Sequence, residues 1–317
     1  MKKIILLLMF SIWGYTKILL VNSYSPKDHA VLQMNGFLCK MYASGYSPEN
    51  FKIYFLNARS NSKNKIFNKA KKILKEINRY QYIVTFDDMA FKLIGIPASK
   101  KGKIVIFSGM NYPYEQYKKQ YNLKNNIGGV FEKLYIKESL EVYNKIIPVH
   151  KVALFYSDGI GEVVKNQILN EVKNSPFEKK VIPIHITTLK ELKTITKKIN
   201  SDSKFSLFIP MAFNAVYNHK KIPFYKLKDI YLKNIKKPDL SPNITFLKLG
   251  FIGFGGVDFY EMGKNTANIL LNYKKTKKLS IVNAPKMHFF VNAKRAKEIH
   301  LKLPQWFLQN YVKEIAW

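Results

Sequence analysis

Two adjacent carboxylates, Asp87 and Asp88, stand out in the sequence because they end a short apolar segment at residues 81–88. Neighbouring side chains on an extended segment point in different directions. The two groups therefore form a poor acid–base pair for catalysis. We expect one carboxylate to cap the helix that follows and the other to receive an amino or hydroxyl group of a ligand.

Sequence motifs that would indicate an enzyme are absent. There is no GxxxxGK[ST] phosphate loop, and Ser108 lacks the flanking glycines of a nucleophile elbow. The segment GFGGVDF at 253–259 does not fit GxGxxG and predicts a tight turn. The six histidines form no metal-ligand pair, and the lone Cys39 excludes a disulfide within the chain and every cysteine-cluster metal site. We expect no enzymatic activity, no metal and no cofactor.

Polar and aromatic residues gather at the ends of several predicted strands. Ligands of open parallel sheets bind at the carboxyl ends of the strands. Hydroxyls and amides would orient a ligand there, a carboxylate would pair with an ammonium group, and tyrosine would stack on an apolar part. The candidate ligand-binding residues are Ser23, Tyr24, Asp87, Asp88, Gly109, Asn111, Tyr156, Ser157 and Asn214.

Strands alternate with helices in two successive runs, which Pro148 separates. This pattern predicts an α/β fold of two doubly wound parallel-sheet lobes with a hinge and a ligand cleft between them. We place lobe 1 at 16–147, completed by about 245–275, and lobe 2 at 148–244, completed by about 276–317. The expected strands lie at 17–22, 51–58, 81–88, 103–109, 127–132, 151–159, 181–187, 205–211 and 288–292, and the clearest helices at 30–41 and 62–79.

The charge of the chain is strongly positive. Of 317 residues, 53 are Lys or Arg and 21 are Asp or Glu, for a net charge of +32. Only Arg59, Arg79 and Arg295 are arginines, and arginine is the residue that clamps phosphate and reads guanine. The lysines are spread along the chain, so we interpret them as a solvated surface. We expect no nucleic-acid partner and at most peripheral contact with a membrane, and a mean hydropathy of −0.17 excludes a polytopic membrane protein.

The first residues have the pattern of a signal peptide. Lys2 and Lys3 precede the uncharged apolar segment Ile4–Gly14, which is too short to span a bilayer as a helix. We predict a signal peptide at residues 1–15 and an exported protein, in the periplasm or on the outer face of the cytoplasmic membrane. The alternative is a buried N-terminal strand.

Seven segments in order along the chain resemble one family. ILLVNSYSPKD is similar to the family's opening strand and turn, IVTFDDMAFKLI to its DDNAF turn, and IVIFSGMNYP to its PVVFxGVN strand. The full set covers residues 18–28, 83–94, 104–113, 126–132, 146–159, 249–272 and 289–304. The family is that of the extracytoplasmic substrate-binding proteins of ABC transporters with a type I periplasmic-binding fold, in the branch that includes aromatic-amino-acid binders.

The resemblance implies a function. Two lobes would close by a hinge motion around a small molecule, such as an amino acid or related compound. The closed monomer would then deliver it to a membrane permease with its ATPase. Two alternatives remain open: a ligand-sensing module of the same fold that feeds a signalling partner, and an enzyme with two Rossmann-like lobes.

Overall fold

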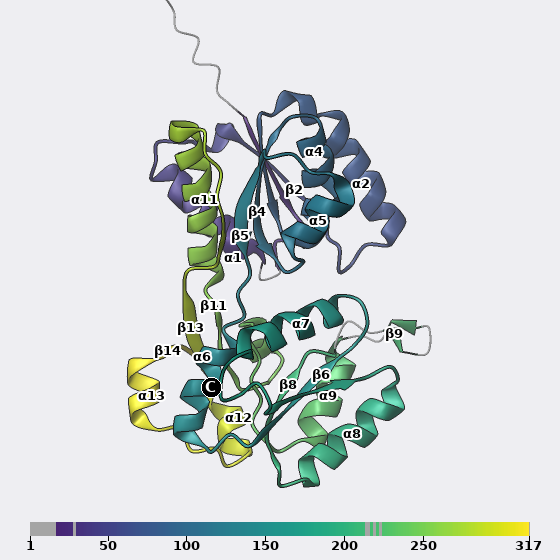
Figure 1. Ribbon diagram of the computed structural model, residues 1–317, viewed down its shortest axis with the longest axis vertical. Helices are drawn as coiled ribbons and strands as arrows, with labels where there is room; N and C mark the ends of the chain where they lie inside the picture. Colours follow the sequence, from purple (N-terminus) through teal and green to yellow (C-terminus); the bar gives the residue numbers. More distant parts are fainter. Residues whose placement is uncertain (1–16, 28–29, 213–215, 218–219, 222–223, 317) are drawn as a thin grey trace, which may run out of the picture.

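The computed structural model describes residues 17–27, 30–212, 216–217, 220–221 and 224–316. Within them the chain forms two lobes, one above the other in Figure 1. The predicted signal peptide and the candidate Asn214 lie outside the described residues.

Lobe 1, the upper lobe of Figure 1, is built on a parallel six-stranded sheet with the strand order β12-β5-β4-β3-β1-β2. Strands β1, β3, β4 and β5 are buried over nearly their whole length, because helices cover both faces of the sheet. The strands are β1 (Ile18–Asn22), β2 (Phe51–Phe55), β3 (Tyr82–Phe86), β4 (Ile104–Met110), β5 (Ile127–Phe131) and β12 (Ile281–Asn283).

Two helices cover one face of this sheet. Helices α1 (Ala30–Tyr42) and α11 (Phe259–Thr276) pack apolar residues such as Phe37 and Met262 against β1, β3 and β4. They approach so closely that a Cβ at Gly263 would lie 1.8 Å from the backbone oxygen of Gln33. Glycine is therefore required at this crossing.

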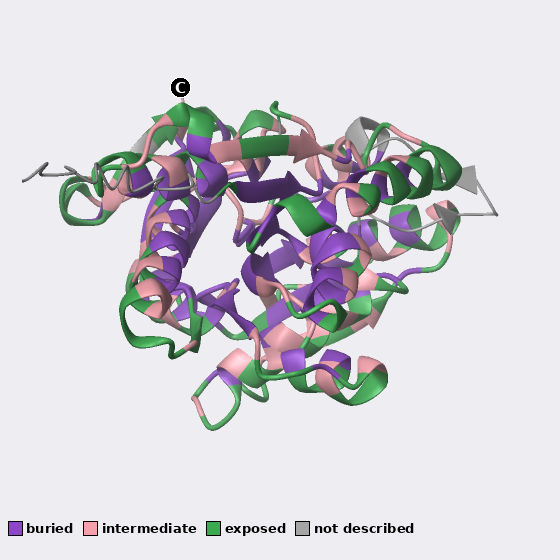
Figure 2. Ribbon diagram, turned by 90° about the horizontal axis from the view of Figure 1, so that it is seen from above, coloured by how far each residue is buried: buried purple, intermediate pink, exposed green. Residues whose placement is uncertain are grey.

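Short helices cover the opposite face. They are α2 (Lys63–Lys75), α3 (Asp88–Ala90), the π-helical turn η3 (Phe91–Gly95), α4 (Ile96–Lys100) and α5 (Tyr114–Tyr121), with the 3₁₀ turns η1 (Pro48–Asn50) and η2 (Ile77–Arg79) nearby. Apolar side chains at helical spacing on α2, including Ile66, Ala70 and Ile73, face the sheet. Figure 2 shows the resulting arrangement, in which buried residues concentrate on the strands and exposed residues on the outer helices.

Lobe 2 contains two three-stranded sheets. The first is parallel, with the order β7-β6-β8, and the second joins β11, β13 and β14. The strands are β6 (Lys151–Tyr156), β7 (Val181–His185), β8 (Phe205–Pro210), β11 (Gly253–Val257), β13 (Met287–Asn292) and β14 (Val312–Ala316), with the short pair β9 (Val216–Tyr217) and β10 (Lys220–Lys221). The helices are α6 (Ile136–Ile146), α7 (Ile160–Val172), α8 (Leu189–Ser201), α9 (Phe224–Asn234), α10 (Thr245–Lys248), α12 (Ala293–Glu298) and α13 (Gln305–Asn310).

The chain crosses between the lobes after β5, after β11 and after β12 (Figure 1). The crossing segments lie side by side: the Tyr135 hydroxyl donates to the Ala284 carbonyl at 2.6 Å, and Asp258 N donates to Lys286 O at 3.0 Å. Parallel crossing segments of this kind form a hinge between two rigid lobes.

The predicted α/β fold of two doubly wound lobes is confirmed, as are the strands expected in each lobe. The tight turn predicted at 253–259 is wrong, because Gly253–Val257 forms the buried strand β11, which pairs with β13. The sequence pattern placed the change of lobe near Pro148 and the return to lobe 1 at about 245–275. In the structure α6 packs with α7 and β11 and so belongs to lobe 2, which therefore begins before Pro148. Helix α11 and strand β12 belong to lobe 1.

Candidate functional site

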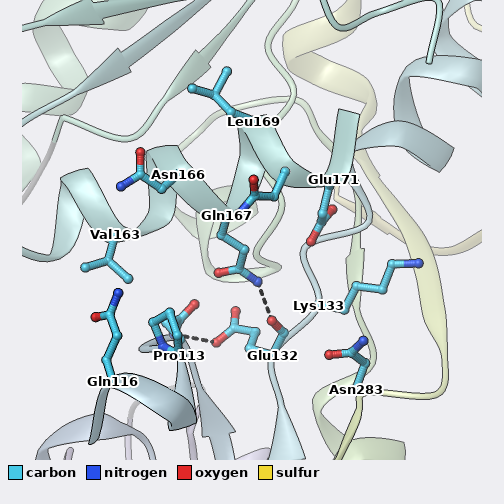
Figure 3. Close-up of a pocket in the computed structure, with 12 residues that line it drawn as sticks. Pro113, Gln116, Glu132, Lys133, Val163, Asn166, Gln167, Leu169, Glu171 and Asn283 are labelled. Atoms are coloured by element: carbon cyan, nitrogen blue, oxygen red, sulfur yellow. Dashed lines mark hydrogen bonds between the residues drawn. The ribbon is translucent and has the colours of Figure 1, made fainter. Parts of the chain in front are cut away.

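A cavity of about 740 Å³ lies between the two lobes beside the first crossing segment. Lobe 1 and the crossing segment contribute one wall, and helix α7 of lobe 2 contributes the other (Figure 3). Six of the residues that line it are carboxamides, which both donate and accept hydrogen bonds. The lining residues are Asn111, Pro113, Gln116, Glu132, Lys133, Val163, Asn166, Gln167, Leu169, Asn170, Glu171 and Asn283.

Behind the wall in lobe 1, Asp87 and Asp88 lie at the point where the strand order reverses, between β1 and β3. Asp87 follows β3 in the left-handed region of φ, at 75°, and its side chain accepts a hydrogen bond from Asp88 N at 2.7 Å. Asp87 thus caps the short helix α3, as expected for one of the two carboxylates. The positive φ turns the chain sharply at the end of β3 and directs the Asp88 carboxylate toward the end of β4.

The Asp88 carboxylate holds the loop that follows β4. It accepts hydrogen bonds from Asn111 N at 3.0 Å and from Tyr112 N at 3.1 Å. The Asn111 side chain in turn donates to Glu132 Oε2 at 3.2 Å, at the end of β5. A hydrogen-bonded chain therefore links the ends of three adjacent strands and reaches the cavity through Asn111 and Glu132.

Burial raises the pKa values of the three carboxyl groups in this wall. Burial, with the neighbouring charge of Asp87, raises the pKa of Glu132 to about 8, against the hydrogen bond from Asn111. Burial and the charge of Asp88 raise the pKa of Asp87 to about 7. Burial raises the pKa of Asp88 to about 6, against its two backbone hydrogen bonds. Some of these carboxyl groups therefore remain protonated near neutral pH.

Ser23 and Tyr24 support Asp87 and Asp88 from the end of β1. The buried Ser23 hydroxyl donates to Phe86 O at 2.9 Å and accepts from Ala90 N at 2.8 Å, so it fastens the turn between β3 and α3. The Tyr24 hydroxyl donates to Asp87 Oδ1 at 3.3 Å, and the Arg59 guanidinium lies 4.6 Å from the centre of the Tyr24 ring.

Gly109 lies in the turn at the end of β4. It adopts a φ of 72°, and a Cβ there would lie 2.6 Å from the amide nitrogen of the Gln33 side chain. Any larger residue would meet both strain and a close contact. Gly109 thus shapes the loop that carries Asn111.

The wall in lobe 2 is one face of helix α7. Val163, Asn166, Gln167 and Asn170 recur at helical spacing and line the cavity. The Gln167 amide donates to the backbone oxygen of Glu132, and this contact is drawn in Figure 3. Helix α7 therefore contacts the crossing segment at Glu132.

Glu171, one turn further along α7, fastens the helix to the crossing segment. Its two carboxylate oxygens accept hydrogen bonds from Leu134 N at 2.7 Å and from Ile136 N at 2.8 Å. Burial raises the pKa of Glu171, against these two hydrogen bonds. The same carboxylate thus lines the cavity and holds the hinge.

The predicted residues of lobe 2 occupy the end of β6. Tyr156 is half-buried and stacks on His185 with ring centroids 4.9 Å apart, and Lys165 Nζ lies 4.8 Å from the centre of its ring. Ser157 is fully buried beside Gly161, where a Cβ would lie 3.0 Å from the Ser157 hydroxyl. Neither residue is among those that line the cavity.

The structure brings Ser23, Tyr24, Asp87, Asp88 and Asn111 together, and Asn111 reaches the cavity itself. Sequence reasoning missed Glu132 and the α7 residues. Glu132 ends β5, so the strand-end argument that selected Asn111 applies to it equally. The α7 residues carried a weaker signal, since polar residues at helical spacing are common on any exposed helix face.

The described residues contain no group of three or more His, Cys, Asp or Glu side chains that would hold a metal ion. Among the same residues, no helix is both long and apolar enough to cross a membrane.

Comparison with solved structures agrees with this architecture. A conserved domain protein from Vibrio cholerae has a TM-score of 0.65 at 16% identity over 95% of this chain and 99% of that one. An ABC domain in complex with L-Trp from Streptococcus pneumonia has a TM-score of 0.67 at 18% identity over 95% and 99% of the two chains. A ligand-free, open substrate-binding protein with adhesive properties from Clostridium difficile has a TM-score of 0.63 at 14% identity over the same shares. These likenesses show the fold.

Two lobes, a hinge and a polar cavity between the lobes define a periplasmic-binding protein of type I fold. The family described as ABC transporter substrate binding protein matches residues 26–314. The chain belongs to that family, and the resemblance read from the sequence is confirmed. A search of the curated proteins finds no match.

Proposed function

We propose that the protein captures a small molecule with a protonated amine, such as an amino acid or a related compound, between its lobes. It then delivers this ligand to the permease of an ABC importer. The observation that carries the proposal is the Glu132 carboxyl group at the wall of the cavity, which Asn111 joins to the Asp88 carboxyl group behind it. A carboxylate in a partly buried site pairs well with an ammonium group.

The rest of the cavity supports this ligand class. The net charge of the chain is +32, yet the acidic Glu132 lines the wall in lobe 1, and Asp87 and Asp88 lie behind it. Opposite them, the amides of α7 offer hydrogen bonds to the polar remainder of a ligand. The ABC domain of similar fold from Streptococcus pneumonia is in complex with L-Trp, which carries an amine.

The proposed role is one of binding rather than catalysis. The lobes close on the ligand about the crossing segments, and the closed monomer docks on the permease. The segment at residues 1–15 directs export, so the ligand is met outside the cytoplasmic membrane.

A thermal-shift screen tests the ligand class. The panel pairs amines with acetylated partners: glucosamine with N-acetylglucosamine, L-tryptophan with N-acetyl-L-tryptophan, and putrescine with diacetylputrescine. At a hundredfold excess over Kd, a ligand stabilises the native state by about 2.7 kcal/mol. We expect at least one amine to raise the Tm by several degrees while its acetylated partner does not. Equal shifts within every pair, or no shift from any compound, would contradict the proposed ligand class.

An Asp88→Asn variant provides the site-specific arm of the screen. The matched control is Asp158→Asn in lobe 2, whose carboxylate is 80% exposed and contacts His185. We expect the amine-induced shift to disappear in Asp88→Asn and to persist in Asp158→Asn. Loss of the shift in both variants would point to a general charge effect.

A further inference from the structure

Asp87, Asp88 and Glu132 form one carboxyl cluster at the wall of the cavity. Asp87 accepts from Asp88 N, Asp88 accepts from Asn111 N, and the Asn111 side chain donates to Glu132. Asp87 is 7% exposed and Glu132 is 6% exposed. Three acidic groups thus share one poorly hydrated site, where the negative charges repel one another strongly.

The groups around the carboxyl cluster supply little positive charge. From the crossing segment, Lys133 points away from Glu132 (Figure 3) and pairs with Glu138 at 2.5 Å. Arg59 lies over the ring of Tyr24, and its charge is the smallest of the influences on the pKa of Asp87. The other titratable groups that interact with the cluster supply no positive charge: Tyr24, Tyr112, Tyr117 and Glu171.

The cavity opens onto one member of this cluster. Glu132 lines the cavity directly, with Gln167 of α7 opposite it (Figure 3). The Oε2 atom of Glu132 accepts a hydrogen bond from Asn111 Nδ2. The Glu132 carboxyl is therefore the member that an incoming ligand meets.

We infer that a cation entering the cavity takes the place of a proton on the carboxyl cluster, so that the protein binds an amine in exchange for a proton. The inference rests on the proposed function, since it requires an amine ligand in this cavity. In the exchange, the O–H bond of the Glu132 carboxyl breaks and its proton passes to solvent. The electron pair stays on the carboxylate, which then pairs with the ammonium group of the ligand. No bond of the ligand changes.

The electrostatics of the carboxyl cluster supply the driving force. Burial raises the pKa of Glu132 to about 8, so the free protein holds this proton at pH 7. An opposite charge within hydrogen-bonding reach lowers a carboxyl pKa by about 1 to 3. Binding an amine at pH 7 is therefore expected to release about 0.4 to 0.9 of a proton.

Isothermal titration calorimetry measures this exchange directly. The probes are putrescine and L-tryptophan, titrated into the full chain at pH 7.0 in phosphate and in MOPS buffer, neither of which contains a primary amine. A released proton is taken up by the buffer, so the binding heat differs between the buffers by the number of protons times the difference in ionisation enthalpy. Between pH 6 and 8 the affinity is expected to rise as much as about tenfold per pH unit and to level off above pH 8.

Each result decides the inference. An amine that binds with equal heat in both buffers and with no pH dependence overturns it, while the proposed function stands. Binding of the acetylated partners alone overturns both the amine ligand and the exchange. A Glu132→Gln variant tests whether the released proton comes from Glu132. In this variant the number of protons released on binding is expected to fall by at least half, whereas Asp158→Asn is expected to match the wild type. Undiminished release in Glu132→Gln overturns the role of Glu132, and the wild-type measurement alone still decides whether exchange occurs.

Discussion

The two walls of the cavity are built in opposite ways. The wall in lobe 1 includes the exposed Pro113, Gln116 and Asn283, but its acidic part is buried at Glu132. Behind it, the Asp88 carboxylate accepts hydrogen bonds from Asn111 N and Tyr112 N. The wall in lobe 2 is a helix face whose residues Asn166 and Asn170 are exposed. The first wall positions charge in a fixed geometry, and the second presents amides that adjust their rotamers to a ligand.

The two walls therefore contribute differently to affinity and selectivity. A charged group held rigidly at low exposure contributes more to binding than a neutral group on a solvated helix, because less solvent screening and less side-chain reordering oppose it. Mutations in lobe 1 are therefore expected to have the larger effects. Four variants test this ordering.

The largest effect is expected for Asp88→Ala. The substitution leaves Asn111 N and Tyr112 N without acceptors, which costs about 1–3 kcal/mol for each buried donor. It also removes a negative charge that lies behind Glu132 and is linked to it through Asn111. We expect amine affinity to fall by about a hundredfold or more and the Tm to drop, as measured by calorimetry and urea unfolding. Asp158→Ala is the control, and equal effects in both variants would refute the fixed geometry of this wall.

Glu132→Gln is expected to change how stability depends on pH. The wild-type carboxyl has an ordinary pKa of 4.5 and a folded-state value of about 8. Because its pKa is raised on folding, its contribution to stability is complete below about pH 4.5 and is lost as the pH rises toward 8. A glutamine side chain does not titrate, so its contribution to stability does not fall as the pH rises. The Tm advantage of the variant should therefore be small at pH 5 and grow up to pH 8, and a constant difference across this range would contradict the raised pKa.

Asn170→Ala is expected to have a moderate effect on binding alone. The side chain lines the cavity from an exposed position on α7, so its removal leaves no buried group unpaired. Loss of one neutral hydrogen bond corresponds to about 0.5–1.5 kcal/mol, or a roughly two- to tenfold loss of affinity. The control is Asn68→Ala on the exposed face of α2. A larger loss than in Asp88→Ala would reverse the ordering of the two walls.

The smallest effect is expected for Ser157→Ala. The Ser157 hydroxyl is buried and has no hydrogen-bond partner among the described residues. Its removal should leave the Tm unchanged or slightly raised, because an unpaired buried hydroxyl costs free energy. Amine affinity should change less than twofold if the ligand stays within the cavity beside the hinge. A fivefold loss would extend the ligand site to the end of β6.

Local sequence patterns were sufficient to predict much of this protein. Apolar segments such as residues 103–109 predicted buried strands, and the periodicity of 62–79 predicted the helix whose main part is α2. The alternation of these elements led to the doubly wound fold. The strand-end argument selected Ser23, Tyr24, Asp87, Asp88 and Asn111, which do meet in lobe 1.

The remaining features depend on contacts between residues far apart in the chain. Glu132 has an ordinary acidic side chain in the sequence, and its raised pKa follows from burial beside Asp87. The α7 residues line the cavity only because the crossing segments set this helix against lobe 1. Periodicity shows which face of a helix is polar but not what lies opposite it. The helices, the strands and the charged edge of the sheet thus follow from local sequence patterns. Which groups share a cavity follows from the folded chain, because burial and through-space charge exist only there.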